Sequence, residues 1–438
     1  GFLLTAAMKT ARYFICPQYL EAAAGGISEG VLNPADQSPV GERMVGRDVE
    51  IRAVLDAANA AQPGWAALDA RTRAGCLHRI ADRIESADPV DIAVLLTREM
   101  GKPYPESVGE IANCGGVFRY YAEMARDDAG KVAGTTQTGS LQLSRYHPYG
   151  VSAHILPYNF PSLLLCWTVA ASLAAGNACV IKPAEATTLS TLAFMGHFDH
   201  LPDGLVSCIP GDAVTGRMLV ESPDTHAVAF TGSVTAGRSV GRACGERMKP
   251  CVIEAGGSDP MIISAHAPMA EAVAGSVMAA FHLTGQICTS AERFFVVGEV
   301  HDEFVRRFDE FTGKLRIGDG MGNHEIGPMV SAEARDRVDR LVQAALSEGA
   351  SLVRGGRAPE GLEAGWFYEP TILTGVRPDM EIMQTECFGP VAAICQVNDF
   401  NEAIMRANDS PFGLGASVFT TDLEESLEAA ERLQSGMV

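Results

Sequence analysis

The sequence has no hydrophobic run long enough to cross a membrane. Its longest largely apolar segment, residues 163–175, contains Thr168 and Ser172 and ends at Gly176, whereas a membrane span needs about 20 apolar residues. The first residues also lack the charged-then-apolar order of a secretory signal peptide. We therefore expect no membrane partner and no export, and we predict a buried helix over 163–175.

Paired cysteines and basic clusters are missing too. The 438-residue chain has 11 cysteines but no Cys-x-x-Cys pair, which is typical of a protein in the reducing cytoplasm. Its 34 Lys and Arg residues are outnumbered by 54 Asp and Glu residues, so the net charge of −20 disfavours a nucleic-acid partner.

A metal site is not expected either. His197 and His200 flank Asp199, but no third ligand lies nearby in the sequence.

Neither common nucleotide-binding fingerprint is complete. Gly-x-Gly-x-x-Gly does not occur, and the segment 232–239 differs from a P-loop because Arg238 stands where a lysine is required. We therefore do not expect nucleoside-triphosphate hydrolysis. Gly232 and Ser233 nevertheless lie between an apolar strand and a helix, and the free N–H groups of such a helix N-terminus bind anions.

The distribution of apolar residues predicts an α/β protein. Three amphipathic helices are expected over 48–61, 71–86 and 89–100. From residue 150 to 257 short apolar runs alternate with helical stretches, which predicts a mostly parallel sheet. The expected strands are 179–182, 206–210, 227–231 and 251–255. A second α/β domain begins near residue 260.

Two further segments stand out. Leu141 and Leu143 alternate with polar residues, as in a half-exposed strand, although an ordinary hairpin would look the same. Cys288 follows a helix predicted over 268–283, and Gly285 prevents that helix from continuing. A cysteine on such an irregular turn can face a cleft, whereas the alternative is a small buried hydrophobic residue.

The segments around Cys288 and elsewhere occur in a characteristic order. They are PYNFP at 157–161, GNACVIKPAE at 176–185, FTGS at 230–233, EAGG at 254–257, GQICTS at 285–290 and ECFGP at 386–390. In this order and at these spacings, nearly the whole chain resembles the aldehyde dehydrogenase superfamily, in its non-acylating NAD(P)-dependent branch.

The resemblance implies a fold and an assembly. It predicts a modified Rossmann dinucleotide-binding domain over 1–126 and 149–256, and a catalytic α/β domain over 257–438. A β-hairpin oligomerisation arm over 127–148 would join subunits into a homo-dimer or homo-tetramer. The family normally continues past Val438 into a Pro-Phe-Gly-Gly loop and a final strand, so the chain is expected to lack the usual C-terminal segment.

The chemistry implied is oxidation of an aldehyde to a carboxylic acid through a cysteine thiohemiacetal and a thioester. This reaction needs a thiolate, oxyanion donors, a hydride acceptor and a base for water. Cys288 matches the family's thiolate, Asn159 its amide donor and Glu254 its base. Taken alone, Asn159 could serve a turn and Glu254 could be a surface carboxylate.

The resemblance also implies NAD as cofactor, with NADP as an alternative. Lys182 and Glu185 match the residues that hold the adenine ribose. The residues expected around the pyrophosphate and nicotinamide ribose are Gly211, Gly232, Ser233, Gly237, Glu386 and Phe388. Considered without the family, Glu386 could be a solvated loop charge.

A small aldehyde is the expected substrate. Six residues fall where the family lines its substrate tunnel, although several could be plain core residues. They are Phe160, Leu164, Trp167, His282, Ile287 and Thr289. This mixed lining contains no arginine, which favours a compact aliphatic or weakly polar aldehyde.

Some residues depart from the family pattern, so two other functions stay open. Tyr158 replaces the usual tryptophan, and Ala255 and Ser258 replace a leucine and a lysine. One alternative is the acylating branch, which passes the thioester to coenzyme A but generally lacks the base found here as Glu254. The other is a catalytically silent binding or structural protein on the same fold.

Overall fold

The chain divides into two compact units. The computed structural model describes residues 12–127, 130–134 and 137–438. Unit 1 contains the described residues of Gly1–Leu32, Pro39–Glu99 and Ser107–Glu254, and unit 2 contains Asn33–Ser38, Met100–Glu106 and Ala255–Val438. Residues 1–11 of the predicted first domain, and 128–129 and 135–136 of the predicted arm, lie outside the described residues.

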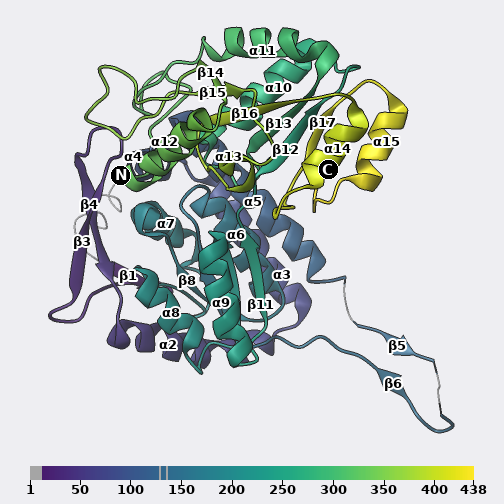
Figure 1. The fold of residues 1–438 in the computed structure, drawn as a ribbon. Coiled ribbons are helices and arrows are strands. Elements are labelled where there is room, and N and C mark those ends of the chain that lie inside the picture. The colour runs from purple at the N-terminus through teal and green to yellow at the C-terminus, as the bar shows by residue number, and fades with distance from the viewer. Residues whose placement is uncertain (1–11, 128–129, 135–136) are drawn as a thin grey trace. The chain divides into compact units, whose positions relative to one another are not determined.

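Unit 1 is built on a seven-stranded sheet (Figure 1). In spatial order the strands are β11 (Cys251–Ala255), β10 (Ala227–Gly232), β7 (Val151–Ile155), β8 (Ala178–Lys182), β9 (Val206–Cys208), β1 (Arg12–Ile15) and β2 (Gln18–Glu21). Strands β10, β7, β8 and β9 pair in parallel, and β1 pairs antiparallel with β9 and β2. The predicted parallel sheet is therefore confirmed.

Helices of unit 1 surround this sheet. They are α2 (Asp48–Ala66), α3 (Ala70–Ser86), α4 (Val90–Met100), α5 (Tyr104–Met124, whose first turn belongs to unit 2), α6 (Pro161–Ala174), α7 (Thr188–Phe194), α8 (Ala213–Glu221) and α9 (Val234–Glu246), with the 3-10 turns η1 (Glu185–Thr187) and η2 (Met195–Phe198). Of these, α2, α6, α8 and α9 pack directly against the strands of the sheet, and both α2 and α6 contact β8. The predicted end of the first helix at residue 61 is wrong, because Trp65 holds another turn by donating to the Leu173 carbonyl at 2.9 Å.

Two hairpins complete unit 1. Strands β3 (Ile27–Leu32) and β4 (Pro39–Val45) pair antiparallel. In the predicted arm, β5 (Val132–Ala133) pairs antiparallel with β6 (Gln142–Leu143) (Figure 1). Its apolar side chains are exposed, with 78% of Val132 and 56% of Leu143 accessible. An isolated two-stranded hairpin is marginally stable in water, so this surface is suited to a partner.

Unit 2 is a second α/β layer structure. Its six-stranded sheet runs in the order β14 (Ser351–Arg354), β15 (Thr371–Thr374), β16 (Val391–Val397), β13 (Ala291–Val297), β12 (Asp259–Ile263) and β17 (Ser417–Phe419). Every pairing is parallel except that of β14 with β15. The helices are α10 (Met269–Phe281), α11 (Gly298–Thr312), α12 (Ala332–Ser347), α13 (Glu381–Gln384), α14 (Phe400–Asn408) and α15 (Leu423–Arg432). This confirms the predicted second α/β region.

No helix in the described part of the chain is both long enough and apolar enough to cross a bilayer. The apolar segment predicted as a buried helix forms α6, which packs beside β7 and β8. Leu165 and Val169 of α6 are fully buried in the core of unit 1. Burial within the sheet layers therefore accounts for the longest apolar run in the sequence.

Candidate active site

Cys288 follows a strained turn in unit 2. The predicted helix end at residue 283 is wrong by two residues, because α10 stops at Phe281 and the chain turns through η3 (His282–Gly285). Leu283 and Thr284 have φ angles of 52° and 56°. Such left-handed conformations of non-glycine residues cost about 1–3 kcal/mol each and persist only where surrounding contacts hold them.

The contacts that hold this turn come from distant parts of unit 2. A Cβ atom at Gly285 would lie 2.1 Å from the Gly389 carbonyl oxygen, so only glycine fits there. The buried Gln286 side chain accepts a hydrogen bond from the Val330 N–H at 3.0 Å. Cys288 itself is half-buried, and among the described residues the only other cysteine that is not buried is Cys251. The turn thus leaves the Cys288 side chain partly accessible.

A half-buried His–Glu pair supports the same turn. His282 Nδ1 lies 3.2 Å from Oε1 of Glu106, and the Leu283 N–H reaches the same oxygen at 3.5 Å. Burial raises the pKa of Glu106 to about 7 and lowers the pKa of His282. His282 was predicted to line the substrate tunnel, whereas nothing local in the sequence pointed to Glu106.

Two glycines bring the Glu386 carboxylate next to the backbone of Cys288. The Gly257 N–H donates to Oε1 of Glu386 at 3.0 Å. A Cβ at Gly256 would lie 2.1 Å from Oε2 of Glu386, and one at Gly257 would lie 2.4 Å from the Cys288 carbonyl oxygen. The predicted thiolate and the predicted nicotinamide-ribose ligand therefore share one corner of unit 2.

A buried carboxyl group, that of Glu292, shapes the loop that carries Glu386. Glu292 accepts hydrogen bonds from the N–H groups of Cys387 at 2.9 Å and Phe388 at 2.6 Å. Burial, followed by the nearby Glu386 charge, raises the pKa of Glu292 to about 8. No local signal pointed to Glu292, because strand β13 has two charged residues near its start, Glu292 and Arg293, and the sequence does not distinguish their roles.

Asn159 lies in unit 1, immediately before α6. It is 2% exposed, and its Oδ1 accepts the Phe160 N–H at 3.1 Å. The amide nitrogen carries the donors that an oxyanion requires. The start of α6 is capped from α5, because Oε1 of Glu110 accepts the Ser162 N–H at 2.8 Å and the Leu163 N–H at 3.1 Å. This capping carboxylate was not identified from the sequence.

Glu254 also lies in unit 1, on the edge strand β11, where it is half-buried.

Three of the six predicted substrate residues, Phe160, Leu164 and Trp167, lie at or within α6 of unit 1. Leu164 is only 5% exposed, whereas Trp167 is 51% exposed. The other three, His282, Ile287 and Thr289, are half-buried residues around Cys288 in unit 2.

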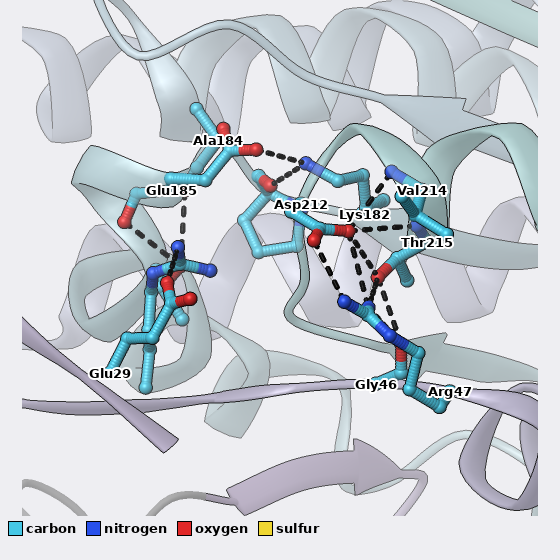
Figure 2. Close-up of polar contacts among 12 residues, drawn as sticks. Glu29, Gly46, Arg47, Lys182, Ala184, Glu185, Asp212, Val214 and Thr215 are labelled. Atoms are coloured by element: carbon cyan, nitrogen blue, oxygen red, sulfur yellow. Dashed lines mark hydrogen bonds and ion pairs between the residues drawn. The ribbon is translucent and has the colours of Figure 1, made fainter. Parts of the chain in front are cut away.

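Lys182 and Glu185 meet at the carboxyl end of β8, as predicted. Lys182 is 4% exposed, and its Nζ donates to the Pro183 carbonyl at 3.0 Å and lies 3.6 Å from Oε1 of Glu185 (Figure 2). Burial lowers the pKa of Lys182, and the nearby Glu185 charge opposes that shift. Ligands of open α/β sheets bind at this end of the strands.

Asp212 caps α8 directly after Gly211. Oδ1 of Asp212 accepts the N–H groups of Val214 at 2.9 Å and Thr215 at 3.0 Å, and Oδ2 pairs with Nη2 of Arg47 at 2.8 Å (Figure 2). Although burial opposes it, these hydrogen bonds keep the pKa of Asp212 well below its usual value. A Cβ at Gly211 would lie 2.1 Å from Oγ1 of Thr215, which explains the glycine.

We expect Asp212→Ala to lower the free energy of unfolding by about 0.5–2 kcal/mol, because the α8 cap is lost. Since the folded pKa of Asp212 is depressed, its stabilisation is complete above the ordinary carboxyl pKa and disappears as the pH falls. Urea unfolding at pH 7 and pH 3 measures this difference. An equal loss at both pH values would contradict the assignment, and Asp203→Ala serves as a control.

Ser233 forms the other helix start expected at the pyrophosphate. Its hydroxyl oxygen accepts the Ala236 N–H at 3.3 Å, so it caps α9. Ser233 is exposed, Gly232 is half-buried and Gly237 is buried. A Cβ at Gly232 would lie 2.8 Å from the Phe230 ring. The exposed N-terminus of α9 has the donors and the dipole that suit a pyrophosphate.

Comparisons with known proteins give one consistent result. Residues 23–438 match the aldehyde dehydrogenase family. The chain is 35% identical to a betaine aldehyde dehydrogenase of Rhizobium etli, over 98% of this chain and 89% of that protein. It is 34% identical to a probable NADP(+) succinate-semialdehyde dehydrogenase of Sinorhizobium fredii, over 93% of this chain and 84% of that protein.

Solved structures agree. Betaine aldehyde dehydrogenase from Staphylococcus aureus, in complex with NAD+, superimposes with a TM-score of 0.95 at 28% identity, over 100% of this chain and 88% of that one. The α/β fold predicted from the sequence is thereby confirmed, as are oxidation of an aldehyde and use of a nicotinamide cofactor. The chain belongs to the aldehyde dehydrogenase family.

Proposed function

We propose that the chain oxidises a compact aliphatic or weakly polar aldehyde to its carboxylic acid through Cys288. The thiolate adds to the aldehyde carbon, and the Asn159 amide and the Cys288 backbone N–H stabilise the oxyanion. When bound, NAD supplies the hydride acceptor. Loss of hydride leaves a thioester on Cys288, and Glu254 takes a proton from the water that hydrolyses it.

The corner formed by Cys288, Gly257 and Glu386 is the observation that carries this proposal. Within one unit, Gly257 lies against the backbone of the half-buried Cys288 and binds a carboxylate suited to a ribose. Glu254 precedes Gly257 by only three positions in the chain. We assign residues 1–126 and 149–256 to a NAD-binding domain, and 257–438 to a catalytic domain.

An NADH-formation assay with a panel of aldehydes, run with and without coenzyme A, tests this function. Hydrolytic oxidation requires turnover that is independent of coenzyme A. Turnover that needs coenzyme A would instead identify the acylating reaction. If no aldehyde yields NADH while the cofactor still binds, the chain is a binding protein on this fold.

We propose that NAD is preferred over NADP. Residues Lys182 and Glu185 suit the hydroxyl groups of a ribose, and the capped N-terminus of α9 suits a pyrophosphate. The Glu185 side chain is 47% exposed beside the nearly buried Lys182. A 2′-phosphate placed there would meet a negative carboxylate, and like charges at contact distance repel.

We therefore expect Glu185→Ser to shift the kcat/KM ratio toward NADP by about tenfold or more, which corresponds to about 1.4 kcal/mol. Steady-state kinetics with both cofactors measures the shift. Glu246→Ser, which removes an exposed carboxylate at the far end of α9, is the control and should leave the ratio unchanged. A wild-type enzyme that favours NADP would contradict the prediction.

We also propose that the protein assembles in the cytoplasm as a homo-dimer or homo-tetramer through the arm at 127–148. The exposed Val132, Leu141 and Leu143 support this assignment.

Leu143→Lys should raise the dissociation constant of the oligomer at least tenfold, which corresponds to about 1.4 kcal/mol. Sedimentation at several protein concentrations measures this constant. Met248→Lys, on a loop with 90% exposure, is the control. A wild-type protein that stays monomeric at all concentrations would remove the proposal.

A further inference from the structure

Two cysteines of unit 1 meet across the turn between α9 and β11. Cys244 lies in the last turn of α9, and Cys251 is the first residue of β11. The N–H groups of Arg247 and Lys249 both donate to the Cys244 carbonyl, at 3.0 Å and 2.9 Å, and fold the chain back on itself. A Cβ at Gly241 of α9 would lie 3.1 Å from Cδ1 of Ile253, so the Ile253 side chain faces α9. Because alternate residues of a strand share one face, the Cys251 side chain faces α9 too, one helical turn further along, beside Cys244.

The two thiols differ in accessibility. Cys251 is exposed, whereas Cys244 is fully buried against Val220 and Val228. Of the 11 cysteines, only Cys251 is classed as exposed, and Cys288 is half-buried. An accessible thiol in contact with a buried one is the arrangement that lets the first be attacked from solution and the second complete a disulfide.

The charges around this pair favour its reactivity. Burial and then the neighbouring Cys251 raise the pKa of Cys244 to about 11, whereas the charges of Lys249 and Arg247 oppose that shift. Once Cys251 carries a mixed disulfide, it can no longer ionise, so its contribution to the raised pKa of Cys244 is lost. The two cationic residues then favour the Cys244 thiolate.

We propose that Cys251 and Cys244 form a reversible redox dithiol, a modification site separate from Cys288. The Cys251 thiolate attacks one sulfur of a low-molecular-weight disulfide and displaces one thiol. Cys244 then attacks the Cys251 sulfur of the mixed disulfide and displaces the second thiol. In total, two protein thiols are oxidised to one disulfide and the small disulfide is reduced to two thiols.

A bridge at this site would tie the last turn of α9 to the first residue of β11. α9 begins at the Ser233 cap, and β11 contains Glu254 three residues after Cys251. A disulfide requires Cα atoms about 4.4–6.8 Å apart. The turn at 247–250 is the segment able to adjust to that spacing, because Met248, with a φ of 55°, is 90% exposed.

The test uses the full chain with Cys288→Ser, so that oxidised glutathione cannot react at the catalytic position. After treatment and alkylation, trypsin cuts behind Arg247 and places the two cysteines in different peptides. We expect a linked pair of peptides that contain Cys244 and Cys251, the loss of two thiols, and recovery of both on treatment with dithiothreitol.

Two further variants identify the order of events. Cys244→Ala should keep a stable glutathione adduct on Cys251, and Cys251→Ala should leave Cys244 unmodified. Circular dichroism confirms that each variant is folded. A glutathione adduct that persists on Cys251 while Cys244 stays reduced would overturn the proposal, and so would failure of Cys251 to react. The outcome does not depend on the proposed aldehyde chemistry, because no substrate or cofactor is used.

Discussion

Glu254→Gln is expected to form NADH once per active site and then stall as an acyl-enzyme. Hydride transfer consumes no water, whereas hydrolysis of the Cys288 thioester needs an activated water. General-base assistance is typically worth about 10²–10⁴-fold, so the steady rate should fall by that factor while the burst remains. Rapid-mixing NADH fluorescence measures the burst, and mass spectrometry of the quenched protein detects the acyl group on Cys288.

A matched control separates this effect from a loss of charge. Glu246→Gln removes one negative charge at the exposed end of α9 and should turn over as the wild type does. Steady turnover of Glu254→Gln at the wild-type rate would show that another group activates the water. Loss of the burst would mean instead that Glu254 acts before hydride transfer, as the base that deprotonates Cys288.

Cys288→Ala is expected to form no NADH at all, neither in a burst nor at steady state. Without the thiol no covalent adduct forms, and the hydride has no thiohemiacetal carbon to leave from. The same rapid-mixing measurement gives the result. NAD binding, measured by calorimetry, should persist, because the predicted ribose and pyrophosphate ligands are other residues.

Cys251→Ala is the matched control for this variant. Cys251 is the most exposed cysteine of the chain, so its loss tests whether any accessible thiol suffices. It should retain full activity under reducing conditions. If Cys288→Ala kept a burst, or Cys251→Ala lost it, the assignment of the nucleophile would be wrong.

The residues that hold the Cys288 turn give these experiments a structural basis. Glu106, and Val330 through Gln286, brace it from distant parts of the sequence. Glu292 orients the loop that carries Glu386. Their hydrogen bonds offset the cost of the left-handed Leu283 and Thr284. A rigid turn of this kind positions a nucleophile with little freedom to lose during the reaction.

Local patterns were sufficient for much of the fold. Strands β8, β9, β10 and β11 and the helices between them follow from apolar runs and their spacing, because burial on a sheet or a helix face imposes periods of two and 3.6 residues. The position of Lys182 and Glu185 at the carboxyl end of β8 also followed from the apolar run that precedes them. Helix ends were less predictable, since α10 stops at Phe281 because of contacts with distant residues.

The candidate residues Cys288, Asn159 and Glu254 came from the order of short segments along the chain, and their roles stay predictions. What surrounds Cys288 was decided only by the tertiary structure. Near Cys288, Glu292 accepts a hydrogen bond from the N–H of Cys387, which lies 95 residues further along the chain. In unit 1, Arg47 pairs in the same way with Asp212 across 165 residues.

Such partners leave no local signal, because a carboxylate looks the same in sequence whether it is solvated or buried. The desolvation that raises the pKa of Glu106 and Glu292, and the hydrogen bonds that oppose this rise, exist only once the chain has folded around them. The sequence by itself therefore determined the order of strands and helices and the residues with suitable chemistry. The tertiary structure decided which of those residues within each unit are buried, braced and held together.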